Sequence, residues 1–184
     1  MYIGTISMRY AKALLAFANE GKVAYIVYQQ ALILEKSFKE VPELKSAMES
    51  PVIPQKEKIK VLGLASGGDI VKELERFFKL VLQQRREKYL YGMVRNYIAL
   101  YRRQENISIG KLTTAVPMDI KEVERIRKIV VDYKGGTAEF STMVDPSIEG
   151  GFIFEIGTYR LDASVANQIR RIKQQFIEKN RRIV

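Results

Sequence analysis

The sequence predicts an α+β protein, with a helical N-terminal part followed by a small α/β part, and three observations support this class. Apolar residues recur at helical spacing from Ser7 to Asn106. From Ile107 the pattern changes to the alternation typical of strands. A chain of 184 residues can bury about 70% of its unfolded surface and form a core without disulfides. We therefore expect a six-helix bundle over residues 1–105 and a domain of β-α-β-β-β-α order over residues 106–184.

The first expected helix is apolar on two sides. It runs from Ser7, a possible N-cap, to Asn19, and Gly21 is placed to end it. A helix that is apolar all round is either buried centrally or contacts a partner, and the periodicity leaves both alternatives open. One apolar stripe is Met8, Ala11, Leu15 and Ala18, and the other is Tyr10, Ala13, Leu14 and Phe17.

Five further helices are expected before the change of pattern. Asp69 is a candidate cap for the fifth of them, whose core stripe includes Leu74, Phe77 and Phe78. Gly67 and Gly68 are not followed by the Lys of a phosphate-binding loop, which excludes that motif. The five helices span residues 22–40, 42–48, from 54 to about 65, 70–84 and about 89–106.

The second part begins with a strand from Ile107 to Val116, ending at Pro117. Asp119 and Glu122 are spaced as a capping box for a helix that residues 134–136 end. A strand over residues 138–144 follows, and we expect the last helix, with the first, to cover the sheet.

The stretch from Asp145 to Ser164 predicts a turn, a β-hairpin and a helix cap. Gly150 and Gly151 permit positive φ or a close backbone approach, and Asp162 or Ser164 can cap the last helix. We assign these four residues structural roles only. The hairpin strands are 152–156 and 159–161, and the apolar stripe of the last helix is Val165, Ile169, Ile172 and Phe176.

The composition disfavours catalysis. The chain has no Cys and no His, which removes disulfides, the usual general base near neutral pH and the commonest zinc ligands. We expect no metal and no cofactor. A net charge of +10 points to acidic partners. The first residues resemble neither a signal peptide nor a transit peptide, so a bacterial cytoplasmic location is expected.

Residues near both ends together resemble one family. They are the run Arg9-Tyr10-Ala11-Lys12-Ala13-Leu14 and, later, Asp145, Gly150-Gly151, Ile153, Leu161-Asp162 and Ser164-Val165. This pattern is similar to the delta subunit of F-type ATP synthases, called the oligomycin-sensitivity-conferring protein in mitochondria.

The resemblance implies a non-catalytic stator subunit that links the catalytic alpha/beta head to the peripheral stalk and so couples proton-driven rotation to ATP synthesis. It implies that the bundle holds the N-terminal helix of the alpha subunit between its first and fifth helices, and that residues 106–184 bind the b subunit. It also implies a monomer when isolated, bound peripherally at the cytoplasmic face of the bacterial cell membrane through the complex. The implied groove residues are Tyr10, Ala13, Leu14, Phe17, Arg76, Lys79, Leu80 and Gln83.

Three alternatives remain at this point. In the first, the groove residues only fill the bundle core. The basic charge suggests an RNA-binding module, although we find no Gly-x-x-Gly clamp and no aromatic-rich strand for base stacking, so nucleic acid is not the favoured partner. Asp145 and Asp162 suggest a hydrolase, although neither has a nucleophile or partner motif beside it.

Overall fold

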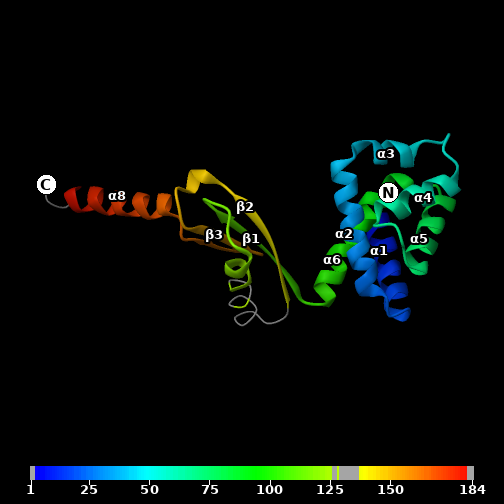
Figure 1. Cartoon of the computed structure of the whole chain (residues 1–184), viewed down its shortest axis with the longest axis horizontal. Coiled ribbons are helices and arrows are strands. Elements are labelled where there is room, and N and C mark those ends of the chain that lie inside the picture. The colour runs from blue at the N-terminus through cyan, green and yellow to red at the C-terminus, as the bar shows by residue number, and fades with distance from the viewer. Residues whose placement is uncertain (1–2, 126–127, 129–136, 182–184) are drawn as a thin grey trace. The chain divides into compact units, whose positions relative to one another are not determined.

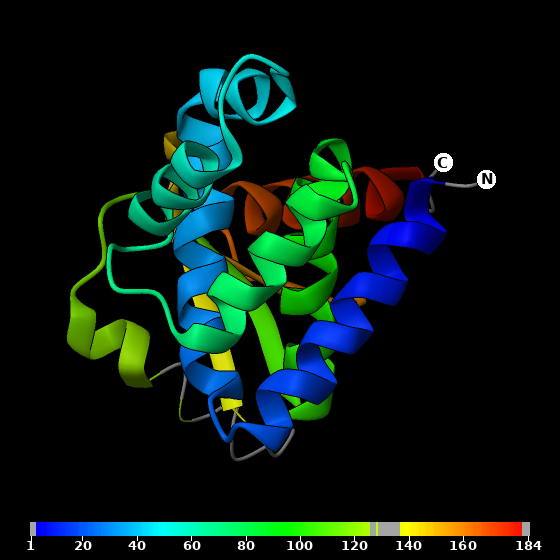
Figure 2. The ribbon, with the colours of Figure 1, turned by 90° about the vertical axis from the view of Figure 1, so that its right-hand side faces the viewer.

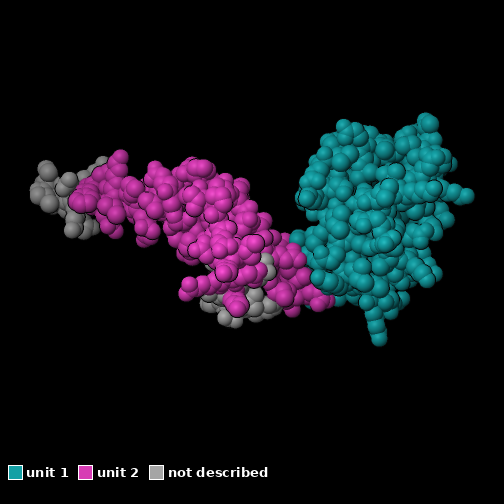
Figure 3. Space-filling view, viewed as in Figure 1, with its two compact units in different colours: residues 1–104 teal, residues 105–184 magenta. Residues whose placement is uncertain are grey.

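The chain divides into two compact units, Met1–Gln104 and Glu105–Val184, which Figure 3 colours separately. The computed structural model describes residues 3–125, 128 and 137–181. Helices make up the described part of the first unit, and the second combines a four-stranded sheet with helices. The predicted α+β class is therefore confirmed.

The first unit is a helical bundle (Figures 1 and 2). Helix α6 packs along both α1 and α2, and α5 packs against α1 and α4. Figure 2 looks onto this bundle, with α1 in dark blue along one side. The elements are α1 (Ile3–Glu20), α2 (Ala24–Glu40), α3 (Pro42–Glu49), α4 (Gln55–Ala65), α5 (Lys72–Gln83), the 3-10 turn η1 (Glu87–Tyr89) and α6 (Leu90–Gln104).

The apolar stripe of α6 forms the centre of the bundle. Tyr97 is fully buried, and its hydroxyl donates to the Ala24 carbonyl oxygen at 2.9 Å. Burial raises the pKa of Tyr97, and the neighbouring Tyr101 adds to this shift. The Tyr101 ring stacks on Tyr28 of α2, with centroids 4.5 Å apart. The buried residues of the stripe are Leu90, Met93, Val94, Tyr97, Ile98 and Tyr101, as its spacing predicts.

The start of α1 differs from the prediction. Ser7 is not an N-cap, because α1 begins at Ile3 and Ser7 is buried inside it, where its hydroxyl oxygen lies 2.9 Å from the position of a Cβ on Gly92. At the other end α1 stops at Glu20, directly before Gly21 as predicted, and Lys22 takes the left-handed conformation, with φ 54°. Its amide donates to the Asn19 carbonyl at 3.0 Å and the Val23 amide donates to the Ala18 carbonyl at 2.9 Å, and these two bonds close the helix as a Schellman turn.

Asp69 does not cap α5, contrary to the prediction. Helix α5 begins two residues later than expected, at Lys72, with Val71 as N-cap and no side-chain cap bond. Gln30 of α2 holds this connection instead. Its Nε2 donates to the Asp69 carbonyl at 2.7 Å and its Oε1 accepts from the Val71 amide at 3.3 Å. A distant side chain thus replaces the local cap.

The second unit is a mixed sheet of order β2-β1-β3-β4. Strand β1 pairs in parallel with β2 and antiparallel with β3, which pairs antiparallel with β4. Residues 120–125 are helical, and the expected end of that helix at residues 134–136 lies outside the described residues. The other elements are β1 (Ile107–Thr114), β2 (Thr137–Val144), η2 (Pro146–Ile148), β3 (Phe152–Ile156), β4 (Tyr159–Asp162) and α8 (Val165–Arg181).

Helix α8 does not cover the sheet, which corrects the expectation of a sheet covered by two helices. The small core consists of Leu112, Phe154 and Ile156, with Val123 and Phe140 packed against it. Helix α8 extends away from the sheet, and its main contact is with η2 (Figure 1). Its apolar stripe is therefore exposed, by 39% at Val165, 53% at Ile169, 53% at Ile172 and 65% at Phe176.

Candidate helix-binding site

A groove of about 200 Å³ lies between α1 and α5. Its base is apolar and closed, because Leu14 and Phe77 are buried in the bundle. Its sides are open, since Ala13 is exposed and 46% of Leu80 is accessible. The lining residues are Tyr10, Ala13, Leu14, Phe17, Arg76, Phe77 and Leu80.

The two helices run in opposite directions along this groove. Glu73, in the first turn of α5, lies beside Gly21 at the end of α1, with its Oε1 3.1 Å from the position of a Cβ on Gly21. Further along, the Tyr10 ring meets Phe77 edge-on, with centroids 6.4 Å apart. The guanidinium carbon of Arg86, just past α5, lies 5.3 Å from the centroid of the Tyr10 ring.

The structure brings six of the eight sequence-derived groove residues together. Lys79 and Gln83 are not among the lining residues, and Lys79 instead forms an ion pair with Glu75 at 2.6 Å. Phe77 lines the groove although sequence reasoning placed it only in the core stripe. Its position three residues before Leu80 was a signal that it shares the same side of α5.

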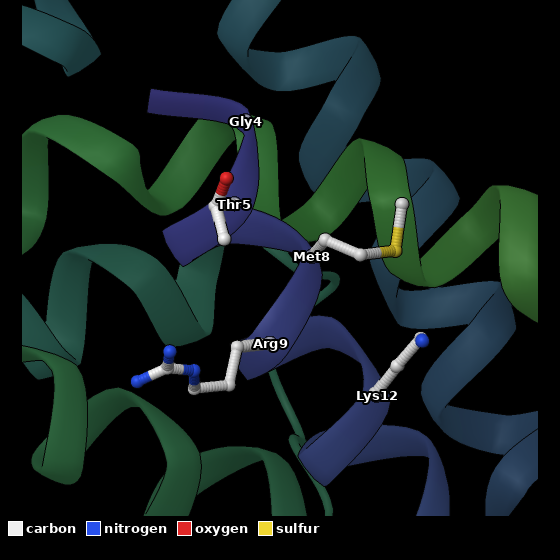
Figure 4. Close-up of a pocket in the computed structure, with 5 residues that line it drawn as sticks. All are labelled: Gly4, Thr5, Met8, Arg9 and Lys12. Carbon is white, nitrogen blue, oxygen red and sulfur yellow. The ribbon is translucent and has the colours of Figure 1, made fainter. Parts of the chain in front are cut away.

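The other side of α1 also borders open space. A wide hollow of about 670 Å³ is lined by Gly4, Thr5, Met8, Arg9 and Lys12 (Figure 4). In this view Met8 and Lys12 project to one side of α1 and Arg9 to the other. Spacing along the helix places Arg9 in line with Ala13, at the edge of the groove.

Backbone contacts join the hairpin to the start of α8. Gly151 has φ 70°, and a Cβ on it would overlap the carbonyl oxygen of Ala163. The Ala163 amide donates to the Phe152 carbonyl at 3.0 Å, and the Val165 amide donates to the Gly150 carbonyl at 3.0 Å. Gly150 and Gly151 therefore permit the close approach that the sequence predicts.

Ser164 is the N-cap of α8, and Asp162 holds it in place. The Ser164 hydroxyl oxygen accepts from the Asn167 amide at 3.2 Å. Asp162 Oδ1 accepts from the Ser164 hydroxyl at 2.6 Å and from its amide at 3.1 Å. These hydrogen bonds lower the pKa of the Asp162 carboxyl, and similar bonds from Ser147 lower that of Asp145. Both carboxylates act in turns and caps.

The described residues contain no cluster of three or more acidic side chains placed to hold a metal ion. In the same part of the chain, no helix is both long and apolar enough to cross a bilayer. The molecule thus offers an open apolar groove on one unit and an exposed amphipathic helix on the other. Open apolar grooves and exposed amphipathic helices are features of proteins that bind helices of other chains.

The chain belongs to the ATP synthase delta (OSCP) subunit family, whose model matches residues 6–176. It is 59% identical over 185 residues to ATP synthase subunit delta of Phocaeicola vulgatus, covering all of both chains. It is 46% identical over 186 residues to the subunit delta of Bacteroides fragilis, again covering both chains completely. Membership makes it a non-catalytic component of the peripheral stalk of F-type ATP synthase. The RNA-binding alternative receives no support.

A solved structure agrees with the fold. A chain of the Toxoplasma gondii mitochondrial ATP synthase hexamer is similar, with a TM-score of 0.65 over 93% of this chain and 97% of that one. The two sequences are only 19% identical, so this likeness concerns the fold alone.

Proposed function

We propose that the chain links the catalytic head to the peripheral stalk by holding one helix of each. The N-terminal helix of the alpha subunit would occupy the groove between α1 and α5, and the end of the b subunit would bind residues 106–184. Such a link keeps the head from turning with the rotor. The observation that carries this proposal is the exposed apolar groove, which is lined by six of the residues that the family resemblance implies.

The groove suits one amphipathic helix. Ala13 has a small side chain on the open side of α1, so a guest helix can approach closely there. Covering Leu80 and inserting two or three apolar guest side chains would contribute about 5 kcal/mol before the costs of association. The closed base formed by Leu14 and Phe77 is already part of the bundle core, so the fold does not depend on the guest.

The b subunit would bind the exposed stripe of α8. Val165, Ile169, Ile172 and Phe176 are spaced by four, three and four residues, the spacing of a helix that packs against another helix. Lys173 lies next to the stripe and is exposed, which favours an acidic side chain in the guest helix, whereas Arg170 and Arg171 are exposed on the opposite side of α8. We also propose a monomer in isolation and, through the complex, a peripheral position at the cytoplasmic face of the bacterial membrane.

The groove is tested with the full chain and a synthetic peptide from the start of the same organism's alpha subunit, by titration calorimetry and circular dichroism. We expect binding with a gain of helix. Ala13→Asp should weaken it at least 100-fold, because the new carboxylate would be desolvated among apolar groups. The helix content of the free variant should not change, since Ala13 is exposed.

Thr5→Asp is the matched control, because it places the same charge on the other hollow of α1 (Figure 4). The affinity of this variant for the peptide should stay within about threefold of that of the original chain, because an exposed charge outside the groove contributes little. Equal losses in both variants, or undiminished binding by Ala13→Asp, would exclude this groove as the alpha-binding site. A loss of helix in Ala13→Asp alone would show that Ala13 belongs to the core.

A further inference from the structure

A buried ion pair joins α4 to the 3-10 turn η1 that follows α5. Lys58 Nζ lies 3.5 Å from Glu87 Oε1, and the two side chains are only 5% and 17% exposed. Replacing such a pair with apolar residues often costs little stability, whereas breaking it leaves a charge buried without its partner. The main effect of the pair is therefore to fix the position of η1 relative to α4.

The connection between α5 and η1 is also held at its other end. The Arg85 amide donates to the Leu82 carbonyl at 3.1 Å. The Arg86 amide donates to the Val81 carbonyl at 3.0 Å, and the two bonds close α5 as a Schellman turn. Arg85 is left-handed, with φ 52°, a conformation that is unfavourable for a residue with a Cβ and needs such support. Arg86 thus lies between two anchored segments, the end of α5 and Glu87.

Arg86 contacts a residue that lines the groove. Its guanidinium carbon lies 5.3 Å from the centroid of the Tyr10 ring, and Tyr10 belongs to the groove lining. The same ring meets Phe77 edge-on, with centroids 6.4 Å apart. The Tyr10 ring is therefore held by α5 through Phe77 and by the connection after α5 through Arg86.

We propose that Lys58 and Glu87 are positioning residues for the groove. They hold Arg86 over Tyr10, and Arg86 holds the Tyr10 ring in the orientation that leaves the groove open to a guest helix. A ring that is not held must be ordered when the guest binds, which lowers the affinity. The described lining of the groove includes none of Lys58, Glu87 and Arg86, so their effect on the guest passes through Tyr10. The inference rests on the proposed function of the groove and adds residues that set its affinity.

Calorimetric titration of the full chain with the alpha-subunit peptide tests the two positioning residues. Lys58→Met and Glu87→Gln should each weaken binding about fivefold, the cost of ordering one side chain. Lys60→Met changes an exposed lysine of the same helix, so it is the matched control and should leave the affinity unchanged. Full affinity in both Lys58→Met and Glu87→Gln overturns the inference and leaves the proposed function intact. Failure of the peptide to bind the original chain overturns both.

Two further variants separate positioning from a general loss of stability. Leu34→Ala removes a fully buried side chain of α2 and should destabilise the bundle about as much as breaking the ion pair, yet leave the affinity unchanged. Arg86→Gln should itself weaken binding about fivefold, and adding Glu87→Gln should cause no further loss. A loss of about 25-fold in the double variant would show independent effects and overturn the inference. A fivefold loss in Leu34→Ala would do the same.

The ring current of Tyr10 reports the contact directly. The δ-methylene protons of Arg86 should be shifted upfield in the original chain and in Leu34→Ala, because the guanidinium group lies over the ring. In Lys58→Met and Glu87→Gln they should return to ordinary arginine values. An upfield shift that persists in both of these variants contradicts the inference.

Discussion

The substitution Gly151→Ala tests whether the start of α8 is held by close backbone contact. Two effects should destabilise the variant. The residue has φ 70°, and an added Cβ would overlap the Ala163 carbonyl oxygen, a backbone atom that cannot rotate away. Gly157 separates the two costs, because it has a similar φ of 59° but no heavy atom within 4 Å of an added Cβ.

The magnitudes follow from this comparison. Left-handed backbone costs a residue with a Cβ about 1 kcal/mol, so Gly157→Ala should destabilise the second unit by that amount. Gly151→Ala carries the same cost plus the displacement of residues 163–164, which overpacking data place at about 2 kcal/mol. We therefore expect about 3 kcal/mol for Gly151→Ala.

Amide hydrogen exchange measures this locally. The opening free energy of the amides in residues 152–162 should fall by about 3 kcal/mol in Gly151→Ala and by about 1 kcal/mol in Gly157→Ala. Amides of the bundle serve as internal reference and should not change. Equal effects of the two substitutions would refute the reasoning, because the contact with Ala163 would then contribute nothing.

Three further predictions concern individual polar side chains. Lys58→Ala should lower the stability of the bundle by about 3 kcal/mol in urea unfolding, since Lys58 is buried and pairs with the mostly buried Glu87 at 3.5 Å. Gln30→Ala should cost about 2 kcal/mol by the same measurement, because two backbone groups before α5 lose their partner. Ser164→Ala should cost about 1 kcal/mol, read from exchange in the first turn of α8. Because the pKa of Asp162 is lowered in the folded chain, its hydrogen bonds stabilise the fold above the ordinary aspartate pKa, and this stabilisation is lost as pH falls through the folded value. Acidification should therefore reduce the difference in stability between Ser164→Ala and the original chain.

Periodicity predicted the bundle well because its helices bury one side each. The six residues of the apolar stripe of α6 are all buried, as their spacing requires. Helix ends were less predictable, because the groups that close them are chosen by tertiary contacts. Gln30 lies 39 residues before Asp69, and no local pattern indicates that its amide serves the start of α5.

The candidate site, like the bundle, could be predicted from the sequence only in part. Tyr10, Ala13 and Phe17 could be singled out because α1 has more apolar surface than one buried side requires. The position of Arg86 over Tyr10 could not, since it depends on the path of the chain after α5. The exposed stripe of α8 was read as core, because an apolar stripe has the same spacing whether it faces its own sheet or another chain.

The attachment of α8 has a mechanical consequence. Torque on a stator is carried by each contact along its length. If the b subunit binds α8, this helix would transmit the force to the sheet of the second unit. In the second unit, the connection between α8 and the sheet includes the backbone hydrogen bonds from the Ala163 amide to the Phe152 carbonyl and from the Val165 amide to the Gly150 carbonyl. Because glycine lets the two segments touch directly, little side-chain material lies between them to deform. If the b subunit binds α8 as proposed, the contact at Gly150 and Gly151 sets how stiffly this end of the subunit carries load.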